Sequence, residues 1–290
     1  MHLKEKVVAI YGGTSGIGRE LTEKLISLGA YVVFLGTKEE KGKALEKALN
    51  EGANNDRSGL KSKRQKQKQK QVAVFYQCDI TDWAAQEKLY AVAMDTFGKS
   101  IDVVIIIAGV LDSSNLVNDT EKEGGYRTLE INLTAAAKAN RLAIQHFVRN
   151  NKPGCIINTS SIYGFCGAPL APLYAASKHG IIGLTKSYGT LFRSTGIRVN
   201  AMAPHFVDTP MVTGPSKQVA SALGMVSMSR CIDAYIRVIE DDSLDGDVMV
   251  ITAEKTFVEK RYQDPTFEKL DQLCSERKRK YREMIFEQLQ

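Results

Sequence analysis

The stretch V-V-A-I-Y-G-G-T-S-G-I-G, residues 7–18, decides the fold class of this chain. Its first five residues are apolar and predict a short buried strand, which ends in a cluster with glycines at positions 12, 16 and 18. Apolar residues at helical spacing from Ile17 to Leu28 then predict a helix. Glycine permits a tight turn and close approach of a ligand, and a helix N-terminus presents free N–H groups to a pyrophosphate. The stretch therefore indicates a dinucleotide-binding turn, with a purely structural glycine turn as the alternative.

Apolar runs and helical patterns continue to alternate along the chain. Further strands are expected at residues 31–35, 72–76, 103–108, 155–158, 198–201 and 248–252, and helices at 39–50, 83–97, 131–149 and 173–191. The run Val103–Ala108 is apolar at every position, which is typical of a parallel strand buried on both faces. This alternation predicts the α/β fold class, as a single doubly wound (Rossmann) parallel sheet of about seven strands with helices on both faces.

Two segments depart from this alternation, and residues 1–258 are otherwise expected to form one domain. Residues 52–71 lack apolar periodicity and end in a lysine- and glutamine-rich tract, so we expect a low-complexity basic loop insertion. Residues 259–290 are charged, with apolar residues at partly helical spacing, and are expected to form a helical C-terminal extension.

Composition and charge exclude several classes of protein. The net charge of +6 comes from residues 57–70, which hold seven Lys and Arg and no acid, so the remainder carries about −1. A near-neutral body argues against a dedicated nucleic-acid-binding domain. The longest apolar run, Val103–Leu111, is shorter than the roughly 20 residues of a membrane-spanning helix, and the first residues do not resemble a secretory signal. We therefore expect no membrane span and a cytoplasmic location.

The five cysteines agree with a reducing compartment, because they are odd in number and form no C-x-x-C pair. No cluster of His, Cys or acidic residues in the sequence has metal-ligand spacing, so no metal is expected.

Three polar residues are candidates for catalysis. Tyr174 and Lys178, in Y-A-A-S-K, are four residues apart and share one face of the expected helix. A nearby ammonium stabilises an ionised phenol, so Tyr174 could exchange a proton with a carbonyl or alcohol oxygen while a nicotinamide handles the hydride. The expected strand at 155–158 leads into Ser160 and Ser161. Ser161 therefore lies at the carboxyl edge, where ligands bind in such sheets. A surface Tyr–Lys pair and a capping serine are the alternatives.

The order of these motifs resembles that of the short-chain dehydrogenase/reductase family, over about residues 3–258. The glycine turn, C-D-I at 78–80, I-N-L around Asn132 and A-S-K-H-G at 176–180 carry the likeness. The stretches L-Y-A-A-S-K-H-G-I-I-G-L-T-K-S (173–187) and I-E-D-D-S-L-D-G-D-V-M-V-I-T (239–252) look like the subgroup of 15-hydroxyprostaglandin dehydrogenases. The resemblance implies an NAD(P)-dependent oxidoreductase that transfers a hydride between NAD(P)(H) and an alcohol or carbonyl substrate.

The resemblance also implies roles for individual residues. Tyr174 would be the general acid/base, Ser161 would hydrogen-bond the substrate oxygen, and Asn132 would position a proton-relay water. Lys178 would hold the nicotinamide ribose and lower the Tyr174 pKa. The implied cofactor-binding residues are Gly12, Thr14, Ser15, Gly16, Ile17, Gly18, Gly36, Thr37, Lys38, Asp79, Ile80, Ala108, Gly109, Tyr174, Lys178, Pro204, Val207 and Thr209.

Cofactor choice depends on the end of the second expected strand. An acid there normally binds the ribose 2′-hydroxyl and repels a 2′-phosphate, but Gly36 stands at that position. Thr37 and Lys38 could instead donate to a phosphate. We therefore expect NADP(H) or NAD(H), with NADP(H) slightly favoured.

Three departures from the family pattern lie at or near the cofactor residues. Tyr11 replaces the usual threonine, Ile106-Ile107 replaces the usual asparagine pair, and His205 replaces a glycine. Two interpretations of His205 are open. It could contact the substrate or the nicotinamide, or it could occupy a loop position that tolerates many residues.

The substrate is expected to be a small or hydrophobic alcohol or carbonyl compound, because the region 209–230, a mobile lid in the family, is small and apolar. Small residues in the helices near 132–149 and 174–191, which the family pairs across a twofold axis, favour a homodimer or homotetramer. A catalytically silent dinucleotide-binding scaffold with the same fold is the main alternative. A nucleic-acid-associated role of residues 57–70 is a third reading, and we expect no nucleic-acid partner.

Overall fold

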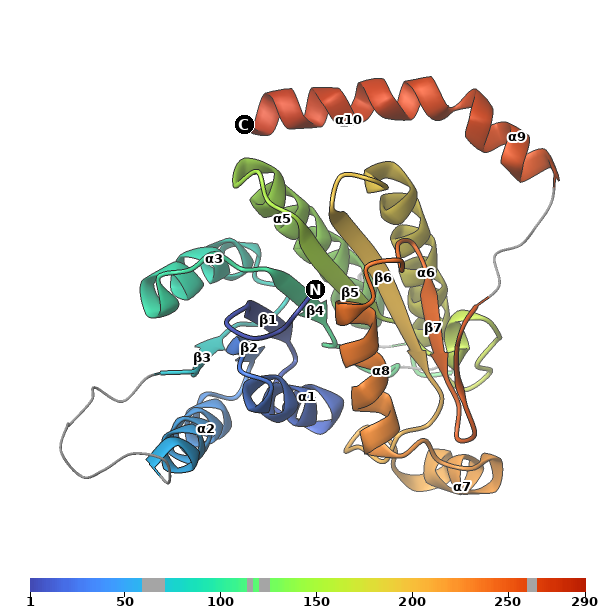
Figure 1. Ribbon diagram of the computed structural model, residues 1–290. Helices are drawn as coiled ribbons and strands as arrows, with labels where there is room; N and C mark the ends of the chain where they lie inside the picture. Colours follow the sequence, from blue (N-terminus) through green and yellow to red (C-terminus); the bar gives the residue numbers. More distant parts are fainter. Residues whose placement is uncertain (59–70, 114–116, 120–125, 260–264) are drawn as a thin grey trace.

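The architecture is one eight-stranded sheet covered by helices on both faces (Figure 1). The computed structural model describes residues 1–58, 71–113, 117–119, 126–259 and 265–290. The strands are β1 (Val7–Tyr11), β2 (Tyr31–Gly36), β3 (Ala73–Gln77), β4 (Val103–Ile106), β5 (Gly154–Thr159), β6 (Ile197–Pro204), β7 (Val248–Ile251) and β8 (Thr256–Val258). Their order is β3-β2-β1-β4-β5-β6-β7-β8, and β1 to β7 are parallel, which confirms the predicted doubly wound sheet. The antiparallel edge strand β8 was not expected, because three partly exposed residues carry too short a pattern.

The helices alternate with the strands. They are α1 (Gly16–Ser27), α2 (Glu39–Ser58), α3 (Trp83–Phe97), α4 (Arg127–Leu129), α5 (Ala136–Arg149), α6 (Pro172–Phe192), α7 (Gly214–Leu223), α8 (Met228–Glu240), α9 (Pro265–Leu273) and α10 (Ser275–Leu289). A π-helical turn, η2 (Glu130–Ala135), joins α4 to α5, and a 3₁₀ turn, η3 (Ile162–Gly164), precedes α6. Within the described residues, no helix is long and apolar enough to cross a membrane.

The core lies in two layers, one on each face of the sheet. Alternate residues of a strand point to opposite faces, so Val8 and Ile10 pack with α1 and α8, while Val7 and Ala9 pack with α3, α5 and α6. The chain leaves β1 for β2 on one side and returns to β4 on the other, so the strand order reverses beside β1. Ligands bind at the carboxyl edge beside such a switch point.

Helix α2 is longer than the sequence predicted. It continues to Ser58, so residues 52–58 of the expected loop insertion are helical, whereas residues 59–70 lie outside the described residues. Side-chain bonds hold this helix to the sheet: Asn50 Oδ1 accepts from the N–H groups of Val72 and Ala73, and Asn50 Nδ2 donates to Ala73 O. Ala53 packs against the core beyond that point. The predicted end at Asn50 was wrong because these contacts are long-range and leave no local apolar period.

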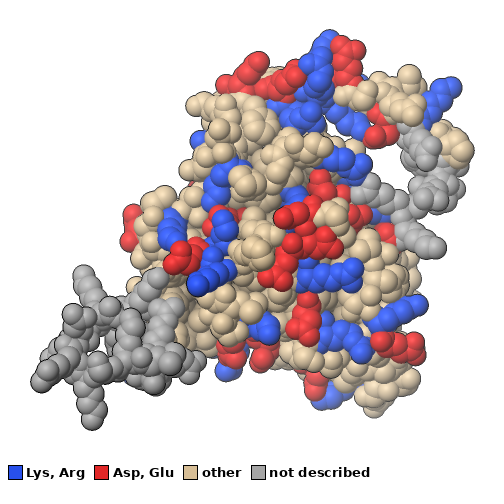
Figure 2. All heavy atoms as spheres, in the orientation of Figure 1, with Lys and Arg blue, Asp and Glu red and all other residues tan. Residues whose placement is uncertain are grey.

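The C-terminal region contains two helices, and α10 lies across α5 and α6 (Figure 1). Ile285, Phe286 and Leu289 pack against the core layer of that face, and the Arg282 guanidinium donates to Leu191 O at 3.1 Å. Lys, Arg and Glu are interleaved along this helix (Figure 2), with paired charges such as Arg279–Glu283 at 2.8 Å and Lys280–Glu276 at 3.0 Å.

Candidate active site

The glycine turn between β1 and α1 forms a close backbone contact with the loop after β4. Gly12 has φ +87°, which favours glycine, and a Cβ on it would lie 2.8 Å from the backbone nitrogen of Ala108. A Cβ on Gly18 would lie 2.1 Å from Gly12 O. Both positions therefore require glycine, and no larger residue fits the turn.

The start of α1 leaves backbone N–H groups available to an anion. Ser15 is the N-cap, and its side chain makes no capping hydrogen bond. The first intrahelical bond runs from Arg19 N to Ser15 O, so the N–H groups of Gly16, Ile17 and Gly18 precede it. This arrangement fits the pyrophosphate of a dinucleotide.

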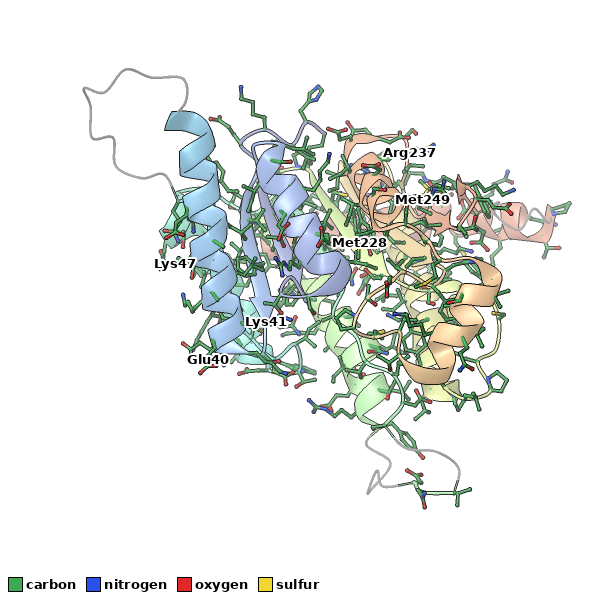
Figure 3. The ribbon with its side chains drawn as sticks, turned by 90° about the horizontal axis from the view of Figure 1, so that it is seen from below. Glu40, Lys41, Lys47, Met228, Arg237 and Met249 are labelled. Atoms are coloured by element: carbon green, nitrogen blue, oxygen red, sulfur yellow. The ribbon has the colours of Figure 1, made fainter. Side chains whose placement is uncertain are left out.

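The loop after β2 lies beside the glycine turn. Gly36 ends β2, and a Cβ on it would be 2.7 Å from Thr14 Cγ2, which brings these two predicted residues together. Thr37 and Lys38 are exposed, and the first turn of α2 follows with Glu39 and Glu40 (Figure 3 labels Glu40 and Lys41). Lys38, Glu39 and Glu40 thus lie near the position that we expect to contact the adenosine ribose of the cofactor.

The loop after β3 holds Asp79 and Ile80. Asp79 Oδ1 accepts from the backbone N–H and the hydroxyl of Thr81, and Asp79 Oδ2 lies 3.6 Å from the Arg127 guanidinium. The Thr81 N–H group, followed by the Thr81 hydroxyl and Arg127, holds the Asp79 pKa below its usual value against the opposing effect of burial. Asp79 is therefore anionic and fixed at neutral pH, while Ile80 is buried.

Asn132 joins the loop after β4 to α6. Its Oδ1 accepts from Val110 N at 2.8 Å, and its Nδ2 donates to Val110 O at 2.8 Å and to Ser177 Oγ at 3.2 Å. Asn132 lies in the π-helical turn η2, a geometry that often marks functional sites. A Cβ on Gly109 would be 3.2 Å from Asn132 Oδ1 and 3.5 Å from Lys178 Nζ. The structure thus brings Gly109, Asn132 and Lys178 together, and the relay water that we expect at Asn132 stays a prediction.

Ser161, Tyr174 and Lys178 meet at the carboxyl edge of β5. The Ser161 side chain lies beside the Tyr174 phenol and acts to lower its pKa, and both side chains are buried. Lys178 Nζ donates to Thr159 O at 2.8 Å and lies 5.4 Å from the centre of the Tyr174 ring. The three side chains come from two elements and form one cluster.

Burial dominates the ionisation of this cluster. It raises the pKa of Tyr174, the Ser161 side chain acts in the opposite direction, and the nearby Tyr163 phenol raises that pKa further. Burial also lowers the pKa of Lys178 to about 8. At neutral pH the phenol therefore keeps its proton and can donate it. The expected lowering of the Tyr174 pKa by Lys178 would have to overcome this burial, and it stays a prediction.

The loop after β6 completes the carboxyl edge. Pro204 ends β6, Val207 is buried and bridges Val226, and Thr209 lies next to the glycine turn, since a Cβ on Gly16 would be 3.2 Å from Thr209 Cγ2. His205 donates its backbone N–H to Ile251 O, and burial lowers the pKa of its imidazole. No described contact joins the His205 side chain to Tyr174.

Sequence reasoning missed Tyr163 and Asp112, which contact Tyr174, and Phe206, which contacts Tyr163. The Tyr163 ring lies edge-on to the Tyr174 ring at 6.4 Å and to the Phe206 ring at 6.0 Å. The Asp112 carboxylate accepts from the backbone N–H of Tyr174 at 2.7 Å. Asp112 stands three residues after Gly109, so a carboxylate at the carboxyl end of a buried strand was the available signal.

Surface hollows elsewhere do not share these features. A hollow of about 530 Å³ between α1 and α8 is lined by residues that include Lys24, Asp233 and Arg237, the last labelled in Figure 3. It contains none of the predicted site residues and mixes charges of both signs. Among the described residues, no group of three or more His, Cys, Asp or Glu could hold a metal ion.

Known proteins resemble this chain in sequence and in fold. The model of the short chain dehydrogenase family matches residues 6–220. A 15-hydroxyprostaglandin dehydrogenase [NAD(+)] from Bos taurus is 31% identical over 274 residues, covering 88% of this chain and 94% of that protein. A 3beta-hydroxysteroid dehydrogenase from Mediterraneibacter gnavus is 29% identical over 223 residues, covering 77% and 74%.

A solved structure supports the same fold. The crystal structure of an actinorhodin polyketide ketoreductase with NADPH matches with a TM-score of 0.72 and 23% identity, covering 86% of this chain and 96% of that chain. The resemblance found in the sequence is confirmed: the chain belongs to the short-chain dehydrogenase/reductase family of NAD(P)-dependent oxidoreductases.

Proposed function

We propose that this chain interconverts an alcohol and a carbonyl compound, with Tyr174 as the group that exchanges a proton with the substrate oxygen. One observation carries the proposal: a buried phenol beside Ser161, with the Lys178 ammonium 5.4 Å from the centre of its ring. In the direction of reduction, Tyr174 donates its proton as the carbonyl carbon gains a hydride, and Ser161 hydrogen-bonds the oxygen on which charge develops.

The residues at the carboxyl edge fit a dinucleotide cofactor. Gly12 and Gly18 let the turn pack tightly against the protein's own backbone, and the N–H groups at the start of α1 would bind the pyrophosphate. Lys178 would hold the ribose near the nicotinamide, and Asp79 would bind the adenine side. When bound, the nicotinamide supplies or accepts the hydride.

The substrate is proposed to be hydrophobic. The Tyr163 ring lies beside the Tyr174 ring, and the Phe206 ring packs against the Tyr163 ring, so the loops after β5 and β6 contribute an aromatic surface next to Tyr174. Aromatic side chains bind apolar groups through large contact areas. A hydrophobic ketone, aldehyde or secondary alcohol suits this aromatic surface better than a strongly charged compound does.

The deciding experiment incubates the purified protein with NADH or NADPH and a panel of hydrophobic and small carbonyl compounds, and follows the absorbance of the reduced nicotinamide. Turnover that Tyr174→Phe abolishes would support the proposal. Cofactor binding without turnover of any compound would favour the catalytically silent scaffold.

Two finer properties are also proposals. We infer self-association from the small and apolar residues of α5 and α6, although α10 packs on the same face, so a pair formed there must include α10 or displace it. The cytoplasmic location and the preference for NADP(H) likewise stay predictions.

A further inference from the structure

Asp112 caps a helix that begins sixty residues away in the sequence. Its Oδ2 accepts from Leu173 N at 3.0 Å, and its Oδ1 accepts from Tyr174 N at 2.7 Å. Both N–H groups belong to the first turn of α6, where no intrahelical partner exists. A carboxylate at this end of a helix also interacts favourably with the helix dipole.

The local sequence supplies no side-chain cap for α6, and the distant carboxylate takes that place. Ala171 occupies the N-cap position and has no side chain that could accept a hydrogen bond. Pro172 follows and has no N–H group. Ala171 N donates to Ala168 O, and Ala175 N donates to Ala171 O. Only the N–H groups of Leu173 and Tyr174 remain at this end, and Asp112 accepts both.

The loop that carries Asp112 also bonds to the other parts of the site. Ala108 N donates to Tyr11 O, next to the glycine turn. Two residues on, Val110 exchanges two hydrogen bonds with Asn132. Two residues further, Asp112 holds the backbone of Tyr174. Three alternate residues of one loop thus connect the cofactor turn, the π-helical turn and the start of α6.

We propose that Asp112 is a positioning residue, which fixes the backbone of Tyr174 relative to the loop that carries Ala108 and Gly109. This inference rests on the proposed function. Its consequence is geometric: this carboxylate, together with Asn132, holds the proton donor and the predicted nicotinamide site at a set separation. Displacement of a reacting group by about 1 Å is enough to cost on the order of 100-fold in rate.

The test separates this role from simple helix capping. Asp112→Ala should lower kcat by about 10- to 100-fold, with KM and the cofactor Kd changed less than about threefold, because the bonds between Val110 and Asn132 still hold the cofactor loop. Asp112→Asn keeps one acceptor oxygen and should give an intermediate kcat. The double variant Asp112→Ala/Ala171→Ser adds a local N-cap, and Ala171→Ser alone is its reference. It should regain the Tm that Asp112→Ala loses, about 2–4 °C. Its kcat should stay as low as that of Asp112→Ala.

The outcomes are distinct. Retention of kcat within threefold in Asp112→Ala, or recovery of kcat together with Tm in the double variant, would overturn the positioning role and leave the proposed function standing. If the double variant does not regain Tm, kcat is compared at a temperature where all variants are folded. A kcat that falls from the wild type to Asp112→Asn and again to Asp112→Ala supports the role. Any other order contradicts it. A wild-type protein that binds NADH or NADPH but turns over no compound would overturn the proposed function, and the positioning role with it.

Discussion

Lys178 Nζ donates to the carbonyl oxygen of Thr159 at 2.8 Å, and this bond holds the ammonium 5.4 Å from the centre of the Tyr174 ring. The strand β5 therefore fixes the cation of the site, whereas α6 fixes the phenol. A cation at that distance favours the phenolate that forms when Tyr174 gives up its proton. Both side chains start from α6, so the bond to β5 sets where the ammonium lies relative to the phenol.

Tyr174→Phe should abolish most of the activity while the fold survives. The ring and its packing are retained, and only the proton donor is lost, so turnover should fall by about 10²–10⁴-fold or more. Steady-state kinetics on a confirmed substrate measures this, and titration with NADPH checks that the cofactor still binds. Near-native turnover of the variant would contradict the mechanism.

Lys38→Ala should weaken NADPH more than NADH. If the Lys38 ammonium pairs with the 2′-phosphate, its removal should raise the NADPH Kd by about tenfold and leave the NADH Kd within about twofold. Lys41→Ala, an exposed lysine in the first turn of α2 (Figure 3), is the matched control and should change neither. A tenfold preference of the wild type for NADH would argue against NADP(H) as the favoured cofactor.

Two buried tyrosines should respond in opposite ways to loss of the hydroxyl. Tyr11 Oη has no hydrogen-bond partner among the described residues, so Tyr11→Phe should keep the free energy of unfolding unchanged or raise it by about 1 kcal/mol. Tyr235 Oη shares a hydrogen bond with Thr159 Oγ1 at 2.8 Å, so Tyr235→Phe should cost about 1–2 kcal/mol. Urea denaturation compares them, and a larger loss in Tyr11→Phe than in Tyr235→Phe would show that Tyr11 has a partner.

His146 should make the protein less stable in acid. Burial lowers its pKa from the usual 6.5 to about 4, so between these values the unfolded chain binds a proton that the folded chain does not. The stability is complete above pH 6.5 and is lost as the pH falls toward 4, by about 1–2 kcal/mol at pH 5 once solvent screening is allowed for.

His146→Gln is the matching variant, because glutamine can still hydrogen-bond Ile101 O, which lies 3.2 Å from His146 Nε2. Its free energy of unfolding should fall less between pH 7 and pH 5 than that of the wild type. Equal slopes for the two proteins would mean that His146 is not the group responsible.

Self-association is expected at micromolar concentration, and sedimentation velocity should show a species larger than the 32.0 kDa chain. The variant Ile285→Asp/Phe286→Asp should detach α10, because both side chains pack against the core layer of the α5 and α6 face. A difference in the association constant between this variant and the wild type would indicate that α10 lies at the interface. A single 32 kDa species for the wild type would contradict the proposal.

The sequence by itself determined the alternation of strands and helices, the glycine turn and the order of Ser161, Tyr174 and Lys178, because each of these is a local pattern. Periodicity fixes a helix or strand, a glycine cluster marks a turn, and a four-residue spacing puts Tyr174 and Lys178 on one helix face. The tertiary structure alone decided what touches these residues across the sheet. Asp112 reaches α6 over 62 positions, Thr159 holds Lys178, and α10 covers α5 and α6. Such contacts depend on where the loops and helices meet in space. A single sequence can mark one partner, such as Asp112 after a buried strand, but no period or spacing identifies the residue that it contacts.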